Sequence, residues 1–142
     1  RAGAAALPRG LRWLLLLGSN LARDRCVHAG LRRLALLGEV TARTPVRRFP
    51  AHDGAGADYH NALAVLACDR DRAALEGAIK AIESALGRRP QAGVVAIDID
   101  ILACSDDAGC GWRADPHALE KREFDQAPVA ALLAELGVSV TR

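Results

Sequence analysis

The stretch VVAIDIDIL, residues 94–102, constrains the fold of this chain more than any other. Side chains alternate between the two faces of a β-strand, so the isoleucines share one face while Asp98 and Asp100 share the other. The isoleucine face predicts a strand that packs on a hydrophobic core. The two carboxylates argue against a buried second face at this strand. We therefore expect a sheet with one covered face and a second face that is free to carry a site.

The other apolar patterns along the chain predict an α+β fold. Strands are expected over residues 12–17, 39–48, 58–68 and 94–102, helices over residues 21–37 and 72–86, and one or two short helices after residue 116. Pro45 within the second of these strands indicates an edge strand, because proline has no N–H to donate to a ladder. This order is typical of a ferredoxin-like sandwich, an antiparallel sheet with helices on one face.

The length of 142 residues indicates a single domain, for which we expect a disordered leader over residues 1–10 and a folded part over residues 11–142. The apolar run from Trp13 to Leu17 is shorter than the core of a secretory signal, and no stretch is long enough to cross a membrane. The four cysteines form no CxxC pair, which predicts reduced thiols and a cytoplasmic protein. A net charge of only +2 does not point to nucleic acid as a partner.

Asp98 and Asp100 are candidates for a metal site. Residues two apart on a strand lie roughly 6.5–7 Å apart, and two ionised carboxylates at that distance repel each other. A magnesium ion relieves the repulsion, since Mg²⁺ is commonly held by one or two carboxylates together with substrate phosphates. A solvated polar face is the alternative interpretation, because so short a motif also occurs by chance. The two residues alone leave both interpretations open.

Short motifs elsewhere in the chain change that balance. In chain order they are Gly18-Ser19-Asn20-Leu21, Thr44-Pro45, Tyr59-His60-Asn61-Ala62, Ile82-Glu83, Gly87-Arg88, Asp98-Ile99-Asp100-Ile101-Leu102, Pro116-His117, Arg122-Glu123-Phe124 and Pro128. In order and spacing they resemble the 6-hydroxymethyl-7,8-dihydropterin pyrophosphokinases (the HPPK family) of folate synthesis, over about residues 14–133. The resemblance implies an ATP-dependent transferase on a ferredoxin-like fold.

The resemblance also implies roles for particular residues. A pterin ring would stack between two aromatic side chains while an amide and main-chain groups read its edge. The residues implied for pterin binding are Thr44, Pro45, Val46, Tyr59, Asn61 and Phe124. The residues implied for nucleotide binding are Lys80, Glu83, Arg88, Ile101, His117 and Arg122. Asp98 and Asp100 would hold two Mg²⁺ ions between ATP and the pterin and, with Arg122, form the catalytic group.

The implied reaction transfers pyrophosphate from ATP to the hydroxymethyl group of the pterin and releases AMP. The chain departs from the family pattern at Val95, where an arginine is usual, and in the short segment 88–93, which usually carries more arginine and a tryptophan. A pterin-binding protein that has lost transfer activity, acting as a carrier or regulator, is therefore a second hypothesis. A ferredoxin-like interaction module with an exposed acidic strand is a third. The partners implied are pterin and ATP, without nucleic acid or membrane, for a monomer or a weak homodimer.

Overall fold

The structure is a computed structural model that describes residues 11–51, 54, 56–87, 94–106 and 111–142. Its strands are β1 (Leu11–Ser19), β2 (Glu39–Arg43), β3 (Arg47–Phe49), β4 (Tyr59–Cys68), β5 (Asp98–Ser105), β6 (Trp112–Ala114) and β7 (Val140–Thr141). Its helices are α1 (Arg25–Leu34), α2 (Arg72–Ala85), α3 (Pro116–Glu120) and α4 (Ala127–Leu136), with a 3₁₀ helix η2 (Glu123–Asp125). The expected leader, residues 1–10, lies outside the described residues.

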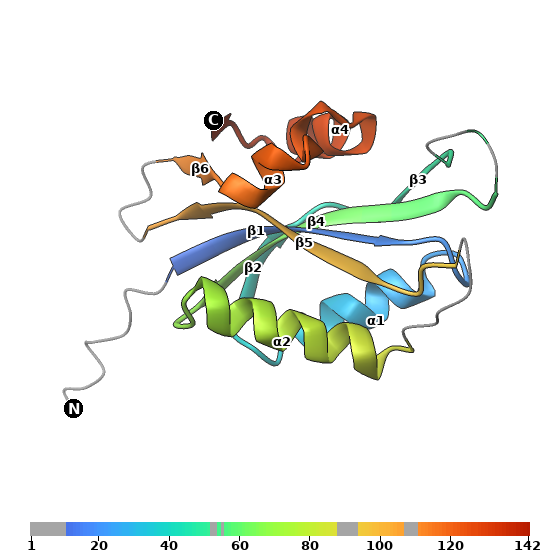
Figure 1. Cartoon of the computed structure of the whole chain (residues 1–142), viewed down its shortest axis with the longest axis horizontal. Helices are drawn as coiled ribbons and strands as arrows, with labels where there is room; N and C mark the ends of the chain where they lie inside the picture. Colours follow the sequence, from blue (N-terminus) through green and yellow to red (C-terminus); the bar gives the residue numbers. More distant parts are fainter. Residues whose placement is uncertain (1–10, 52–53, 55, 88–93, 107–110) are drawn as a thin grey trace.

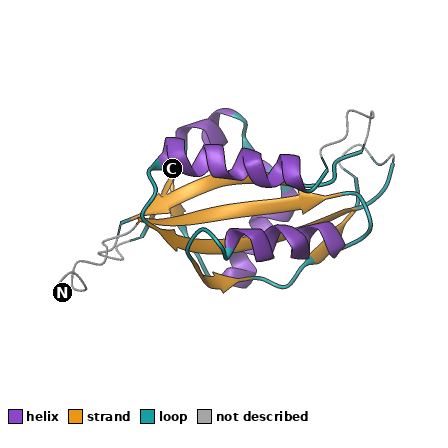
Figure 2. Cartoon of the chain, turned by 90° about the horizontal axis from the view of Figure 1, so that it is seen from below, coloured by secondary structure: helices purple, strands orange, loops and turns teal. Residues whose placement is uncertain are grey.

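The strands form one sheet in the order β2-β4-β1-β5-β6-β7, and β3 pairs with the end of β4 that β2 leaves open. All described neighbours run antiparallel except β6 and β7. Helices α1 and α2 lie on one face, which we call the first face (Figure 1). Figure 2, seen from that side, shows helices in front of the sheet that run roughly along its strands. The predicted α+β, ferredoxin-like fold is confirmed.

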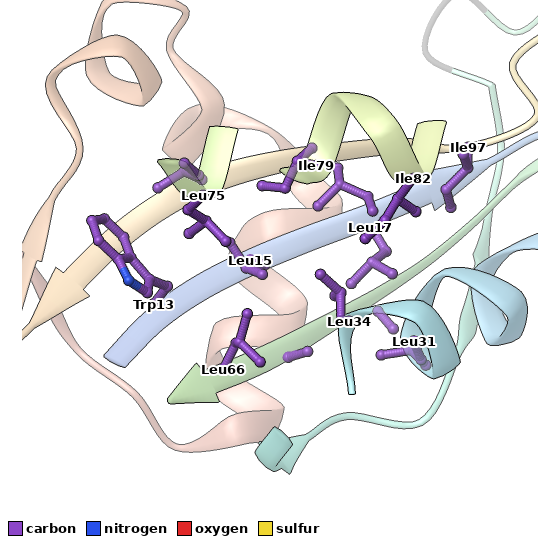
Figure 3. Packing of buried hydrophobic residues seen from close by; sticks show 14 of the residues in the cluster. Trp13, Leu15, Leu17, Leu31, Leu34, Leu66, Leu75, Ile79, Ile82 and Ile97 are labelled. Atoms are coloured by element: carbon purple, nitrogen blue, oxygen red, sulfur yellow. The ribbon is translucent and has the colours of Figure 1, made fainter. Parts of the chain in front are cut away.

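The first face carries the larger hydrophobic core. Trp13, Leu15 and Leu17 of β1 point toward α2 and α1 (Figure 3). The helices meet them with residues spaced three or four apart, which are Val27, Leu31 and Leu34 of α1 and Leu75, Ile79 and Ile82 of α2. The isoleucines of the stretch 94–102 join the same core. The sequence alternation therefore assigned this face correctly.

The opposite face, which we call the second face, is covered in part. Leu14 and Leu16 of β1 pack there with Leu63 of β4 and with Val129 and Leu132 of α4. In Figure 1, α3 and α4 lie on the opposite side of the sheet from α1 and α2. The expected open face is thus confined to one end of the sheet. The reason is that β1 is apolar on both faces, so both faces need a cover.

Several element boundaries differ from those predicted. The helix expected over residues 21–37 begins only at Arg25, because Ala22 and Arg23 adopt left-handed backbone angles, with φ of 57° and 56°. The strand expected over residues 39–48 is divided into β2 and β3. Between the two, the buried Thr44 accepts a hydrogen bond at its Oγ1 from the Leu63 N–H, at 3.0 Å. A threonine side chain thus satisfies the β4 main chain where the strand pairing stops.

The strand expected over residues 94–102 begins at Asp98 and continues to Ser105. Before it, the Val95 N–H donates to Asn20 Oδ1 at 2.6 Å and the Val95 carbonyl accepts from the Asn20 N–H at 3.0 Å. The loop expected over residues 105–115 contains the short strand β6. The second helix matches its prediction, since the Asp71 side chain caps it by accepting from the Ala74 N–H at 2.8 Å.

Within the described part of the chain, no helix combines the length and the apolar character that a membrane crossing requires. Cys26, Cys68 and Cys104 are free thiols, and Cys110 lies outside the described residues.

Candidate active site

The edge of the sheet along β5 is the setting of the candidate site. Among the described residues of β5, only Ala103 and Cys104 pair with β6. The earlier part of β5 therefore faces side chains instead of a strand. The Ile99 N–H donates to Glu83 Oε2 of α2 at 3.0 Å, and the Leu102 carbonyl accepts from the Asp115 N–H at 2.8 Å. Helices α2 and α3 therefore bracket this edge from the two faces of the sheet.

A cavity of about 160 Å³ lies between α2, α3 and this edge of β5. Its lining comes from α2, β5, α3 and the turn into η2, and consists of Arg72, Glu76, Ile79, Lys80, Glu83, Asp98, Ile99, Asp100, Ile101, His117, Ala118, Lys121 and Glu123. Within this described lining, five carboxylates face three permanently cationic side chains. The cavity is therefore acidic, and it favours a cation over a bare polyanion.

The negative charge is concentrated around Asp100. Burial raises the pKa of Asp100 to about 7, and the charges of Asp98 and Glu123 act in the same direction. The ammonium of Lys121 opposes them, with its Nζ 4.0 Å from Asp100 Oδ1 and 3.8 Å from Glu123 Oε2. One lysine does not compensate three carboxylates, so the group is under electrostatic stress that a divalent cation would relieve.

A magnesium ion fits the donors that the structure presents here. In the described residues no group of three or more His, Cys, Asp or Glu side chains is arranged to hold a metal by itself. Asp98 and Asp100 supply two carboxylates on one face of β5, as the alternation predicted. Mg²⁺ typically takes one or two carboxylates and completes its octahedron with water and substrate phosphates. The arrangement thus suits a cation that is shared with a ligand.

Four of the residues expected at the nucleotide line this cavity, namely Lys80, Glu83, Ile101 and His117. Glu83 is buried, and its hydrogen bond to Ile99 joins α2 to the edge of β5. Because N–H groups two residues apart point the same way, the main chain of Ile101 also faces outward at this edge.

Of the two arginines expected at the nucleotide, the structure describes Arg122, which pairs with Asp125. Arg122 Nε donates to Asp125 Oδ2 at 3.0 Å, and 80% of the Arg122 side chain is exposed. Its backbone is left-handed, with φ of 57°, which is the turn between α3 and η2. Arg88 lies outside the described residues, as does the segment 88–93. Val95, where an arginine is usual, acts through its main chain alone in the hydrogen bonds with Asn20.

Asn61, which is expected at the pterin, lies on the second face in line with Asp98 of the cavity. Gly18 of β1 pairs with Asn61 of β4 on one side and with Asp98 of β5 on the other, so the three form a row across the sheet. A Cβ atom on Gly18 would lie 2.6 Å from Asn61 Nδ2 and 3.9 Å from Tyr59 Cδ2. The glycine therefore makes room for the Asn61 amide, which occupies the position that a Cβ atom would take.

Aromatic side chains stand at the margins of that row. Tyr59 lies two residues before Asn61 in β4, and the two side chains share a face because residues two apart on a strand do so. Phe124 is buried in the second-face core, and the Arg142 guanidinium lies 5.3 Å from the centre of its ring. Asn61 is itself held in place, since its Nδ2 donates to the Leu17 carbonyl at 3.2 Å.

Thr44, Pro45 and Val46 form the break between β2 and β3, alongside β4. The Thr44 side chain serves the fold through its bond to Leu63, and Val46 packs against the first-face core. The Thr44 main chain is also engaged, because its N–H donates to the Leu63 carbonyl at 3.0 Å and its carbonyl accepts from Arg43 Nη1 at 3.2 Å. Main-chain groups of Pro45 and Val46 are therefore left to bond to the edge of a ligand.

Sequence reasoning missed the part that Lys121, Arg72 and Asp115 take in the cavity. Arg72 lines the cavity and binds the Asp115 carboxylate in a bidentate manner, through Nε and Nη2. One signal was present: Lys80 and Lys121 are the only lysines in a chain whose other basic residues are arginines, and both line this cavity.

The fold and this edge define a ferredoxin-like α+β protein with a pair of strand carboxylates in an acidic cavity, in line with Gly18 and Asn61. Residues 14–134 match the family model described as 7,8-dihydro-6-hydroxymethylpterin-pyrophosphokinase (HPPK), and the chain belongs to this family. A search of curated proteins finds no match to the chain. Membership places the protein among the transferases of pterin and folate biosynthesis, a family that uses ATP, Mg²⁺ and a pterin.

Proposed function

We propose that the protein transfers pyrophosphate from ATP to 6-hydroxymethyl-7,8-dihydropterin. The pterin hydroxyl oxygen attacks the β-phosphorus, the bond from that phosphorus to the oxygen bridging the α-phosphate breaks, and AMP leaves. The observation that carries the proposal is the position of Asp98 and Asp100, which stand between the acidic cavity and the row of Asn61 and Gly18. A group held at these carboxylates touches both substrates.

The proposal assigns the two aspartates to two Mg²⁺ ions. When bound, Mg²⁺ supplies charge neutralisation and alignment of the phosphates. The excess of carboxylates in the cavity supports this, because a triphosphate alone would meet repulsion there. Lys80, His117 and Lys121 then contribute the protein's own positive charge and N–H donors to the phosphates.

We assign the base and sugar of ATP to the edge of β5. The outward main chain of Ile101 offers a donor and an acceptor to a purine, and Glu83 holds that edge to α2. Arg122 joins the phosphates in this proposal after leaving Asp125. That exchange costs little, because both side chains are exposed and solvent weakens such an ion pair. Arg88 is proposed as a further phosphate ligand.

We place the pterin on the Gly18 row, between Tyr59 and Phe124. Asn61 and main-chain groups of residues 45–46 would bond to the ring edge, which is rich in donors and acceptors. Arg142 must leave the Phe124 ring for the pterin to stack there. An exposed cation–π contact is worth roughly 0.5–1 kcal/mol, so the exchange for a stacked heterocycle is favourable.

A pterin-binding protein without transfer activity is the second candidate. It is favoured by the outward position of Arg122 and by the engagement of Arg72 with Asp115, since neither guanidinium faces Asp98 and Asp100. In either case we expect a cytoplasmic monomer or weak homodimer.

The experiment that decides is turnover with ATP, Mg²⁺ and 6-hydroxymethyl-7,8-dihydropterin, followed by chromatography of AMP. Release of one AMP per pterin consumed, and none with EDTA, supports the transferase. Pterin binding, seen by fluorescence and lost in Tyr59→Ala, without AMP release supports the carrier. Absence of binding of either ligand would leave only an interaction module.

A further inference from the structure

An ion pair at the wall of the cavity joins α2 to α3. Arg72 Nε donates to Asp115 Oδ1 at 2.6 Å, and Arg72 Nη2 donates to Asp115 Oδ2 at 2.8 Å. The Asp115 side chain is 4% exposed, while that of Arg72 is 38% exposed. A two-pronged contact of this kind fixes orientation as well as distance.

Asp115 makes two further hydrogen bonds that join elements of the site. Its N–H donates to the Leu102 carbonyl of β5 at 2.8 Å, and its Oδ2 accepts from the His117 N–H at 3.1 Å, which caps α3. One residue therefore ties α3 to the edge of β5, to α2 and to its own first turn. Burial raises the pKa of the Asp115 carboxyl, but the Arg72 hydrogen bonds and charge, with the N–H groups of His117 and Ala118, lower it further, so the net pKa lies below the usual value.

The element held in this way carries two of the basic groups of the cavity. His117 lies in α3 and Lys121 directly follows it, with the Lys121 Nζ 4.0 Å from Asp100 Oδ1. Helix α3 has only five residues and buries only Ala118. Because α3 buries so little apolar surface, the hydrogen bonds and the ion pair of Asp115 set the position of this helix.

Arg72 is not a phosphate ligand in this arrangement. Its Nε and Nη2 are directed at Asp115, and its Nη1 lies 3.6 Å from Glu76 Oε1. The guanidinium thus faces carboxylates on each side. Its charge is used to place other groups.

We infer that Arg72 and Asp115 are positioning residues for the nucleotide, which hold α3 so that Lys121 and His117 face the phosphates bound at Asp98 and Asp100. The inference rests on the proposed function and adds to it two residues that touch neither substrate.

The test measures affinity for the magnesium complex of α,β-methylene-ATP, whose bridging carbon prevents the transfer. Asp115→Asn keeps the size and the capping oxygen of the side chain but loses its charge. Arg72→Lys keeps the positive charge but loses the bidentate hydrogen bonding of the guanidinium. In isothermal titration calorimetry at low temperature, the stoichiometry reports the folded fraction and the Kd reports the geometry of the site. We expect each variant to weaken binding of this nucleotide about tenfold, in the range of residues that orient a ligand group.

Three comparisons separate positioning from a general structural role. The pterin Kd should stay within about twofold, because Asn61 and Tyr59 are not connected to the pair, and the double variant should lose no more than the worse single one. Arg47→Lys is the matched control, since Arg47 forms a similar two-pronged pair with Glu135 that joins β3 to α4 away from the cavity. It should leave the nucleotide Kd unchanged.

Wild-type nucleotide affinity in both Asp115→Asn and Arg72→Lys would overturn the positioning role and leave the proposed function standing. Equal loss of pterin and nucleotide affinity would also overturn it, because it would indicate a general loss of structure. A wild-type protein that does not bind the magnesium nucleotide would refute the proposed function, and the inference with it.

Discussion

The two faces of the sheet differ in how far their hydrophobic cover extends. On the first face, the apolar rows of β1, β4 and β5 are covered by α1 and α2 from one end to the other, and Leu15 and Leu17 are fully buried. On the second face, α4 covers the rows around Leu16 and Leu63, whereas the next row is Asn61, Gly18 and Asp98. The same strands therefore stabilise the fold through one face and carry the site where the cover of the other face ends.

This difference predicts that substitutions on the two faces have separable effects. A change on the first face should lower the free energy of unfolding, because it leaves a cavity in a closed core. A change in the polar row of the second face should alter ligand binding or turnover while the free energy of unfolding stays nearly the same. Variants that fail to separate in this way would refute the division.

The largest effect is expected at Asp98. Asp98→Ala should lower kcat for AMP release by about 10³-fold or more, because removal of a group that holds charge against the transferring phosphates costs several kcal/mol. The melting temperature should hardly change, since Asp98 is exposed. Turnover assays and thermal unfolding on the same preparation check both parts. A variant with unchanged kcat would remove the proposed mechanism.

The next effect is expected in the core of the first face. Leu15→Ala should lower the free energy of unfolding by about 3 kcal/mol, as for other fully buried leucines. Leu36→Ala is the matched control, because Leu36 is 81% exposed and its loss should cost less than about 0.5 kcal/mol. Urea denaturation measures both. The pterin Kd of the folded fraction should match that of the wild type, and a weaker pterin Kd would show that the faces are coupled.

A smaller effect is expected at Gly18. Gly18→Ala places a methyl group 2.6 Å from Asn61 Nδ2, so the amide that lies against this glycine must shift. We expect the pterin Kd to rise about tenfold, the loss of roughly one hydrogen bond to a buried partner. Gly77→Ala, on the exposed side of α2 with nothing near its added Cβ, should instead stabilise the protein by about 1 kcal/mol. Fluorescence titration of the pterin distinguishes the two.

The smallest effect concerns the cost of the acidic group to stability. The folded-state pKa of Asp100, about 7, lies above its ordinary value of 3.8, so the stability associated with its proton is complete below pH 4 and is lost as pH rises to about 7. Asp100→Asn removes this loss. In EDTA at pH 8 the variant should therefore be more stable than the wild type, with no difference at pH 4. Equal melting temperatures at pH 8 would contradict the repulsion inferred among Asp98, Asp100 and Glu123.

Local features of the chain were predictable because they depend on neighbours in sequence. The alternation in VVAIDIDIL assigned the isoleucines to the core and both aspartates to the other face. The edge position indicated by Pro45 is confirmed, since β2 and β3 pair with β4 alone among the described strands. The late start of α1 was missed, because the left-handed angles of Ala22 and Arg23 leave no mark on the apolar pattern.

The sequence by itself determined the order of strands and helices, the core stripe of each helix and the pairing of two carboxylates on one strand face, since each follows from a period of two or from a spacing of three and four residues. Only the tertiary structure decided that Arg72 meets Asp115 across 43 positions and that Lys121 approaches Asp100. It also decided that the helices after β6 cover half of the second face. The physical reason is that these contacts depend on how α2, β5 and α3 pack together, and side-chain packing between distant segments leaves no period in the sequence to read.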